Sequence, residues 1–260
     1  MKLSVNGAET FVATGGRDFD PALPTIVFLH GAGLDHSGWA LLARSFASHH
    51  FGVLAPDLPG HGQSAGAPLS SIVAMADWTA ALMTAVGVRT ARLVGHSMGS
   101  LVVLEFAVRH PERITGLALI AAAAPMRVSD DLLRAAKAND HTAIDMIAIW
   151  GNGYRATLGG SLAPGLWMLG GAERLLERAR PGVLFADLTA CNNYGDALAA
   201  AGKVTAPTIA ILGSRDLMTP AKSGKALAAA IPGSRTTVLE GAGHLLMSER
   251  PEEVFAALRS

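Results

Sequence analysis

Short apolar runs rich in β-branched residues alternate with longer, helix-like segments along most of this chain. The expected strands cover residues 25–29, 52–55, 91–94, 114–120, 208–212 and 236–239. The expected helices cover residues 37–48, 70–86, 97–109, 220–230 and 251–258. Alternation of this kind builds βαβ units around a mostly parallel sheet, so it predicts an α/β fold. A weaker signal predicts an antiparallel edge hairpin over residues 3–5 and 10–13.

The alternation stops between Ala124 and about Thr205, where helical stretches and Gly/Pro breaks occur without a convincing strand. A strand-free insertion of this length indicates a helical subdomain over one edge of the sheet. We therefore expect a core of residues 1–124 and 206–260 and a helical cap of residues 125–205, inserted after strand 6, with a helix that returns to the core. Apolar side chains in the cap fit either packing on the core or a substrate pocket: Met146, Ile147, Ile149, Trp150, Leu166, Trp167, Met168 and Leu169.

Composition limits the partners that the protein can have. The 21 basic and 21 acidic residues cancel, so nothing suggests nucleic acid or an anionic membrane as a partner, and a small neutral substrate fits better. Hydrophobic residues make up 50% of the chain, but no run approaches the roughly 20 apolar residues of a membrane span. We expect a soluble protein of 260 residues with one domain and an insertion, as a monomer or a homodimer.

Two further features bear on localisation. The first 12 residues contain no apolar stretch of the kind found in a secretory signal. Cys191 is the only cysteine, which excludes an internal disulfide and agrees with a reducing compartment. A cytoplasmic location is therefore expected, with Cys191 as a structural thiol rather than a nucleophile.

The segment Gly95-His96-Ser97-Met98-Gly99 stands at the junction between a predicted strand and a predicted helix. Glycine has no Cβ, so two glycines around a serine permit a turn tight enough to project the hydroxyl above the sheet. Ser97 is therefore a candidate nucleophile, and an ordinary flexible turn is the alternative interpretation. His96 is expected to point away from the site and to be a packed, hydrogen-bonded residue.

A serine nucleophile needs a base, usually histidine, and the base needs a carboxylate that orients it. Asp216 follows the expected strand 208–212, and His244 follows the expected strand 236–239. The carboxyl ends of parallel strands meet at one edge of a sheet, so both side chains can reach Ser97. Asp57 also follows a strand and is the main rival acid.

An oxyanion formed at Ser97 would need backbone N–H donors, and each such donor contributes roughly 2.7–4 kcal/mol. The segment His30-Gly31-Ala32-Gly33 follows the first long strand, and its glycines allow close approach of the backbone. We assign the N–H of Ala32 as one donor, with Gly33 as the alternative, and the N–H of Met98 as the other.

With these segments in this order, the chain resembles the serine α/β-hydrolases that carry a helical cap, the group of carboxylesterases, lactonases and C–C bond hydrolases. The resemblance rests on the His30 segment, residues 56–64, the turn at Ser97, the Asp216 segment and Gly243-His244. It implies an eight-stranded sheet, a covalent acyl-enzyme, and neither metal nor cofactor. It also implies that Asp57 organises its own loop, and that His30 and His61 fix loop geometry.

Departures from the family pattern narrow the chemistry that the resemblance implies. Dehalogenases and epoxide hydrolases of this fold have aspartate where this chain has Ser97, so acyl transfer is favoured. C–C hydrolases usually carry tryptophan after the catalytic histidine, where this chain has Leu245. The substrate pocket is expected to include Gly31, Trp150, Trp167, Met218 and Leu245.

Residues 151–156 formally match a dinucleotide-binding fingerprint, but they lie in the expected cap without a preceding strand, so a Gly-rich bend is the better interpretation. The sequence thus predicts a cofactor-independent serine hydrolase of the carboxylesterase or lactonase type, which acts on a small, largely apolar ester or lactone through Ser97, Asp216 and His244. The alternatives are C–C hydrolysis, perhydrolysis or acyl transfer at the same triad, or a non-catalytic small-molecule receptor.

Overall fold

An eight-stranded sheet forms the centre of the molecule in the computed structural model, which describes residues 1–160, 165 and 167–260. Its order is β1-β2-β4-β3-β5-β6-β7-β8, with β1 and β2 antiparallel to their neighbours and the remaining strands parallel. The strands are β1 (Lys2–Val5), β2 (Ala8–Ala13), β3 (Thr25–Leu29), β4 (Gly52–Pro56), β5 (Ala91–His96), β6 (Ile114–Ile120), β7 (Thr208–Gly213) and β8 (Arg235–Leu239). The predicted α/β fold is confirmed, and the weak hairpin signal corresponds to β1 and β2.

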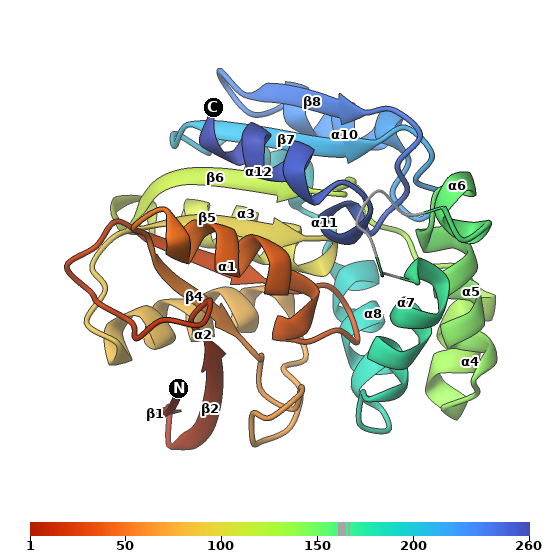
Figure 1. Cartoon of the computed structure of the whole chain (residues 1–260), viewed down its shortest axis with the longest axis horizontal. Coiled ribbons are helices and arrows are strands. Elements are labelled where there is room, and N and C mark those ends of the chain that lie inside the picture. The colour runs from red at the N-terminus through yellow and green to blue at the C-terminus, as the bar shows by residue number, and fades with distance from the viewer. Residues whose placement is uncertain (161–164, 166) are drawn as a thin grey trace.

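Helices cover both faces of this sheet (Figure 1). Those of the core are η1 (His36–Trp39), α1 (Ala40–Ser48), α2 (Ile72–Ala85), α3 (Met98–Arg109), η2 (Pro111–Arg113), α10 (Ala221–Ala229), α11 (Leu246–Glu249) and α12 (Pro251–Arg259). The expected helices agree within a few residues, except that residues 37–48 divide into η1 and α1. The short helix α11 was not predicted, because four residues are too few to show a helical period.

Side chains along β3 point alternately to the two faces of the sheet, and this alternation explains the two hydrophobic layers. Val27 and Leu29 pack with α2 and α3 in one hydrophobic cluster, whereas Ile26 and Phe28 pack with α1 and α12 in the other. Every residue of β3 is buried, as expected for a parallel strand that is covered on both faces. Local signals set the helix boundaries: Ser71, for example, caps α2 by accepting the N–H of Ala74 at 3.1 Å.

Between β6 and β7 the described residues form helices and no strand, and we call residues 125–205 the cap segment. These helices are α4 (Asp130–Ala138), α5 (Thr142–Gly151), α6 (Tyr154–Thr157), α7 (Met168–Glu177), α8 (Val183–Asn193) and α9 (Ala197–Ala201). Figure 1 shows α4, α5, α7 and α8 beyond the carboxyl ends of the central strands, whereas α9 contacts the core helices α3 and α10. The division into core and cap at residues 125 and 205 stays a prediction.

Within the part of the chain that the structure describes, no helix combines the length and apolar character needed to cross a membrane. Among the helices that the structure describes, α2 is the longest, with 14 residues, against the roughly 20 that a span requires.

Candidate active site

Ser97 occupies a strained turn between β5 and α3. Its backbone has φ 52° and ψ −117°, a combination that costs of order 1–3 kcal/mol in a residue with a side chain. Hydrogen bonds hold the turn in place: the N–H of Ser97 donates to the carbonyl of Ile120 at 2.9 Å, and its carbonyl accepts both the N–H and the hydroxyl of Ser100. The surrounding structure therefore maintains a backbone conformation that the residue alone would avoid.

The two glycines of this turn are required by close backbone packing. A Cβ on Gly95 would lie 2.0 Å from the carbonyl oxygen of Gly99, and a Cβ on Gly99 would lie 2.2 Å from the carbonyl oxygen of Leu29. Both separations are far below van der Waals contact. The sequence pattern around Ser97 thus has a steric cause, and the turn brings α3 directly against β3.

Asp216 and His244 meet at the edge of the sheet where β7 and β8 end. The Nδ1 atom of His244 lies 2.8 Å from Oδ2 of Asp216, and both side chains are almost completely buried. Oδ1 of Asp216 accepts the N–H groups of Met218 and Thr219. Burial alone would raise the pKa of Asp216, but the charge and hydrogen bond of His244 and the hydrogen bonds from Thr219 together lower it. The carboxylate is therefore ionised and fixed in orientation.

Thr219 is a polar neighbour of this pair that the sequence reasoning missed. Its hydroxyl lies 2.6 Å from Oδ2 of Asp216, 3.1 Å from Nδ1 of His244 and 2.9 Å from the carbonyl of Ala121. One hydroxyl can donate once and accept in the same geometry, so it can stabilise both members of the pair. The segment Asp216-Leu217-Met218-Thr219 carried a local signal, because a carboxylate often accepts N–H groups two and three residues ahead.

The loop of His244 is fixed through its backbone as well. Its carbonyl accepts Nε2–H of His96 at 2.9 Å, and its N–H donates to the carbonyl of Gly151 in the cap segment at 2.8 Å. Burial, with the neighbouring His244, lowers the pKa of His96 to about 3, so His96 is neutral. His96 is a packed, hydrogen-bonded residue, as expected, but the expectation that it points away from the site is wrong. It lines the same cavity as Ser97, and its ring centroid lies 4.8 Å from that of His244, because its hydrogen bond to the His244 carbonyl holds it beside the candidate base.

The backbone N–H groups of Ala32, which lines the cavity, and of Met98 stay the predicted oxyanion donors. Within the described residues neither donates to a protein acceptor, whereas the N–H of Gly33 donates to Oδ2 of Asp187 at 2.8 Å. Met98 is the first residue of α3, so its N–H also benefits from the positive end of the helix dipole. Of the two alternatives in the loop after β3, the geometry favours Ala32, since the N–H of Gly33 is already committed.

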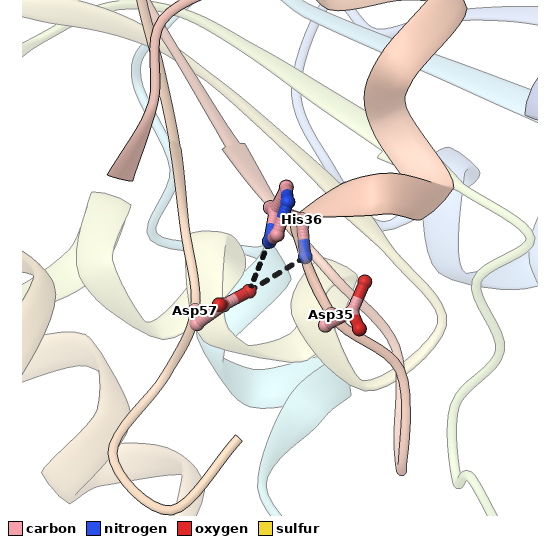
Figure 2. A group of neighbouring side chains, drawn as sticks. All are labelled: Asp35, His36 and Asp57. Carbon is pink, nitrogen blue, oxygen red and sulfur yellow. Dashed lines mark hydrogen bonds and ion pairs between the residues drawn. The ribbon is translucent and has the colours of Figure 1, made fainter. Parts of the chain in front are cut away.

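The rival acid Asp57 serves a different loop. Figure 2 shows its carboxylate facing both the ring and the backbone nitrogen of His36, each at 2.8 Å from Oδ1. Its other oxygen accepts the N–H of Gln63. Of the two candidate acids, only Asp216 has a carboxylate bonded to His244 among the described residues.

Asp35, His36 and Asp57 place three possible metal-ligand atoms within 4.8 Å of one another, a combination that sequence spacing did not reveal. Figure 2 shows Asp35 turned away from the other two. Its carboxylate accepts the N–H and hydroxyl of Ser37, and its second oxygen lies 2.7 Å from the guanidinium of Arg178. The guanidinium of Arg178 already neutralises the charge of Asp35. The hydrogen bonds of these three side chains therefore explain the cluster as a structural link between loops.

Ser97 and His244 line one cavity of about 200 Å³ between the sheet edge and the cap segment. The expected pocket residues Gly31, Trp150, Met218 and Leu245 line it too. Apolar side chains from α4, α5, α7 and α8 complete it: Leu132, Ile147, Leu175, Leu176 and Leu188. Arg127 is the only Lys, Arg, Asp or Glu among the described residues of the lining. The cavity therefore suits a mainly apolar ligand.

Trp167 is a correction to the expected pocket. Its side chain is 68% exposed and does not line this cavity in the described part of the chain; it borders a separate surface hollow. The reason is Gly170, where a Cβ would lie 2.2 Å from the Trp167 ring: the ring occupies the space that a side chain on the first turn of α7 would fill. Leu166, expected to be in the same apolar stripe, lies outside the described residues.

Comparison with known proteins identifies the family. A family model described as alpha/beta hydrolase fold matches residues 24–251. A pimeloyl-(acyl-carrier protein) methyl ester esterase from Chromobacterium violaceum is 32% identical, over 95% of this chain and 96% of that protein. Among solved structures, the enol-lactonase from Burkholderia xenovorans LB400 is 25% identical with a TM-score of 0.82, and covers 100% of this chain and 98% of its own. A thermophilic esterase from Thermogutta terrifontis is 26% identical with a TM-score of 0.78, over 100% and 96% of the two chains.

The chain therefore belongs to the α/β-hydrolase family. Its similarity to esterases and lactonases along nearly the whole length confirms the prediction of a hydrolase of the esterase type.

Proposed function

We propose that this protein hydrolyses a small, uncharged carboxylic ester or lactone through a covalent acyl intermediate on Ser97. The observation that carries the proposal is that Ser97, on its strained turn, and His244 line one cavity, while Asp216 is bonded to Nδ1 of His244. Nucleophile, base and orienting acid in this arrangement are the requirements of serine-based acyl transfer.

The proposed reaction has two stages. The hydroxyl oxygen of Ser97 attacks the ester carbonyl while its proton passes to Nε2 of His244, and the resulting oxyanion accepts the N–H groups of Ala32 and Met98. Collapse of the tetrahedral intermediate breaks the bond to the alcohol, which leaves with the proton from His244. Water then attacks the acyl-serine by the same route, and releases the acid and the free serine.

The lining of the cavity supports the choice of substrate class. Its surface is mainly aliphatic, and no carboxylate among the described residues lines it to bind a cationic substrate. The cap segment carries eight basic and eight acidic residues, so its charge gives no preference for a charged partner. The Chromobacterium relative is a methyl ester esterase by name and the Burkholderia structure an enol-lactonase, and both bonds are within the proposed class.

Burst kinetics with p-nitrophenyl acetate and butyrate test the proposal, with the wild type and Ser97→Ala compared near neutral pH. We expect release of p-nitrophenol that continues beyond one equivalent in the wild type and falls about 10⁴-fold in the variant. Labelling by a fluorophosphonate should also be lost in the variant. Turnover that survives the substitution would contradict the assignment of Ser97, whereas labelling without turnover on any ester or lactone would indicate the receptor alternative.

A further inference from the structure

Helix α8 of the cap segment buries a carboxylate beneath the loop that carries Ala32. Asp187 has no exposed surface, and its Oδ2 accepts the N–H of Gly33 and the Nε2–H of His61, each at 2.8 Å. Gly33 belongs to the loop after β3, and His61 to the loop after β4. A single oxygen atom thus joins two core loops to the cap segment, at residues separated by 154 and 126 positions in the chain.

The hydrogen bonds of His61 define its charge. Nδ1 faces the carbonyl of Pro59 at 3.0 Å, and Nε2 faces the carboxylate of Asp187. Both partners are acceptors, so both ring nitrogens carry a proton and the ring is an imidazolium. Burial alone would lower the pKa of His61, but the charge and hydrogen bond of Asp187 outweigh it and raise the pKa. Asp187 and His61 are therefore a buried ion pair.

The neighbouring His30 has the opposite state, which is consistent with this pair. Its ring lies 4.7 Å from that of His61, and its Nε2 accepts the N–H of Leu58 at 3.1 Å. Burial, with the charge of His61, lowers the pKa of His30 to about 4. One neutral and one charged ring can stack in the space where two charged rings would repel each other.

Packing holds the same loop against α8. Gly33 has φ +67°, and a Cβ there would lie 2.9 Å from Cδ1 of Leu184 on α8. The N–H of Gly33 points to Asp187, so that of Ala32, one residue earlier, is left for the cavity. Gly31 lies against the nucleophile, since a Cβ on it would lie 3.3 Å from Cβ of Ser97.

We propose that Asp187, together with His61, is a positioning residue that fixes the loop after β3 so that the N–H of Ala32 is directed at the oxyanion. This inference rests on the proposed serine hydrolase function. A loop that moves by about 1 Å costs of order 100-fold in rate, and loss of one oxyanion donor about 100- to 1,000-fold. The carboxylate therefore acts on the transition state through the loop, since Asp187 itself is not among the described residues that line the cavity.

The first test compares the wild type with Asp187→Asn, which keeps the shape of the side chain but removes its charge. We expect kcat for p-nitrophenyl butyrate to fall about 10- to 100-fold while KM changes less than about threefold. Inhibition by phenylboronic acid, whose tetrahedral adduct with serine places an oxygen at the oxyanion position, should weaken by a similar factor. Asp145→Asn on α5 is the matched control, because it removes an exposed cap carboxylate, and its kinetics should equal those of the wild type.

A second pair of variants separates positioning from folding. His61→Gln keeps an N–H donor near the place of Nε2 and should retain most of kcat, whereas His61→Leu removes the donor and should resemble Asp187→Asn. Combining His61→Leu with Asp187→Asn should cost little more than either change alone, because both remove one interaction. Rates are expressed per mole of protein labelled by fluorophosphonate, so that unfolded material does not contribute.

The outcomes distinguish the two proposals. A wild type without Ser97-dependent turnover overturns the proposed function and this inference with it. An active wild type with Asp187→Asn of unchanged kcat and unchanged boronate affinity overturns this inference alone. The same holds if His61→Gln and His61→Leu lose equal activity, or if Asp187→Asn changes only the melting temperature. Should Asp187→Asn fail to fold, the two His61 variants decide the matter by the same criteria.

Discussion

The backbone carbonyl of Gly151, at the end of helix α5, accepts the N–H of His244 at 2.8 Å. It also accepts the N–H of Leu245 at 3.2 Å. The last turn of a cap helix therefore supplies the acceptor that orders the loop of the candidate base. A helix leaves its final carbonyls without partners inside the helix, and here one of them is used by another part of the chain.

Gly153, two residues beyond this contact, is required by close packing, and its replacement should be costly. A Cβ on Gly153 would lie 2.5 Å from the carbonyl oxygen of Gly241 and 2.8 Å from Oε2 of Glu249. We expect Gly153→Ala to lower the free energy of unfolding by about 1–3 kcal/mol and to reduce kcat, because the loop of His244 must shift. Urea denaturation and ester kinetics measure the two effects.

Gly171→Ala is the matched control for that substitution. Gly171 lies in α7, and a Cβ on it would meet nothing within 4 Å. Alanine should stabilise the protein by about 0.5–1 kcal/mol there, since glycine within a helix is unfavourable. Equal effects at positions 153 and 171 would contradict the steric explanation.

The strain at Ser97 predicts a conflict between stability and activity. Ser97→Gly and Ser97→Ala both remove the hydroxyl, but only glycine adopts the positive φ of 52° without cost. Both variants should be inactive. Relief of the backbone strain should make Ser97→Gly more stable than Ser97→Ala by about 1 kcal/mol, and the greater entropy of glycine in the unfolded chain reduces this difference. Thermal denaturation of the two proteins checks this; a less stable glycine variant would mean that the turn is not strained.

The hydroxyl of Thr219 should matter for the orientation of His244. Thr219→Val keeps the shape of the side chain and removes the contacts with Asp216, His244 and Ala121, so we expect kcat to fall about tenfold with little change in KM. Thr219→Ser keeps the hydroxyl and should recover most of the rate. If valine and serine behave alike, the hydroxyl has no role in the reaction.

The pair of His36 and Asp57 predicts a pH-dependent contribution to stability. Burial alone would lower the pKa of His36, but the hydrogen bond and charge of Asp57 raise it overall. Since the folded-state pKa is above the ordinary value, the stabilisation is complete below that ordinary value and is lost as pH rises through the folded value. Burial alone would raise the pKa of Asp57, but hydrogen bonds from His36 and Gln63 lower it, so its contribution is lost as pH falls through that lowered value.

His36→Asn keeps a neutral donor for Asp57 and removes the charge, so it isolates this effect. We expect the variant to be less stable than the wild type by about 0.5–1 kcal/mol near pH 6, with the difference fading toward pH 9, because the pair is partly exposed and screened. Free energies of unfolding measured across this range test the sign. A difference that grows with pH would mean that the ion pair is not the cause.

Much of the core could be predicted because its signals are local in sequence. The strands that precede Ser97 and Asp216 are short, largely apolar runs, and the strand before His244 is rich in β-branched residues; a parallel sheet brings the carboxyl ends of all three together. The glycines at 95 and 99 predicted a tight turn, because they stand on both sides of Ser97. In each case the prediction depended only on a residue and its immediate neighbours in the sequence.

The contacts that order the site were not predictable in the same way, because they join distant segments. Asp187 lies on the buried side of α8, and nothing in its sequence neighbours indicates a bond to Gly33 or His61. Residues 151–156 formally matched a dinucleotide-binding motif, but Gly153 serves close packing against Gly241 and Gly243 rather than a phosphate. Trp167 was expected in the pocket because it is large and apolar, whereas the absence of a side chain at Gly170 gives it a place on the surface.

The hydrogen bond from His244 to Gly151 has a consequence for engineering. Together with the bond from Gly33 to Asp187, it means that α5 and α8 each hold one part of the candidate machinery. These helices also line the cavity that would select the substrate. The same helices therefore influence both substrate specificity and reaction rate in this chain. A cap transplanted from a relative would have to bring equivalents of Gly151 and Asp187 with it, or the chimaera would bind a new ester but cleave it slowly.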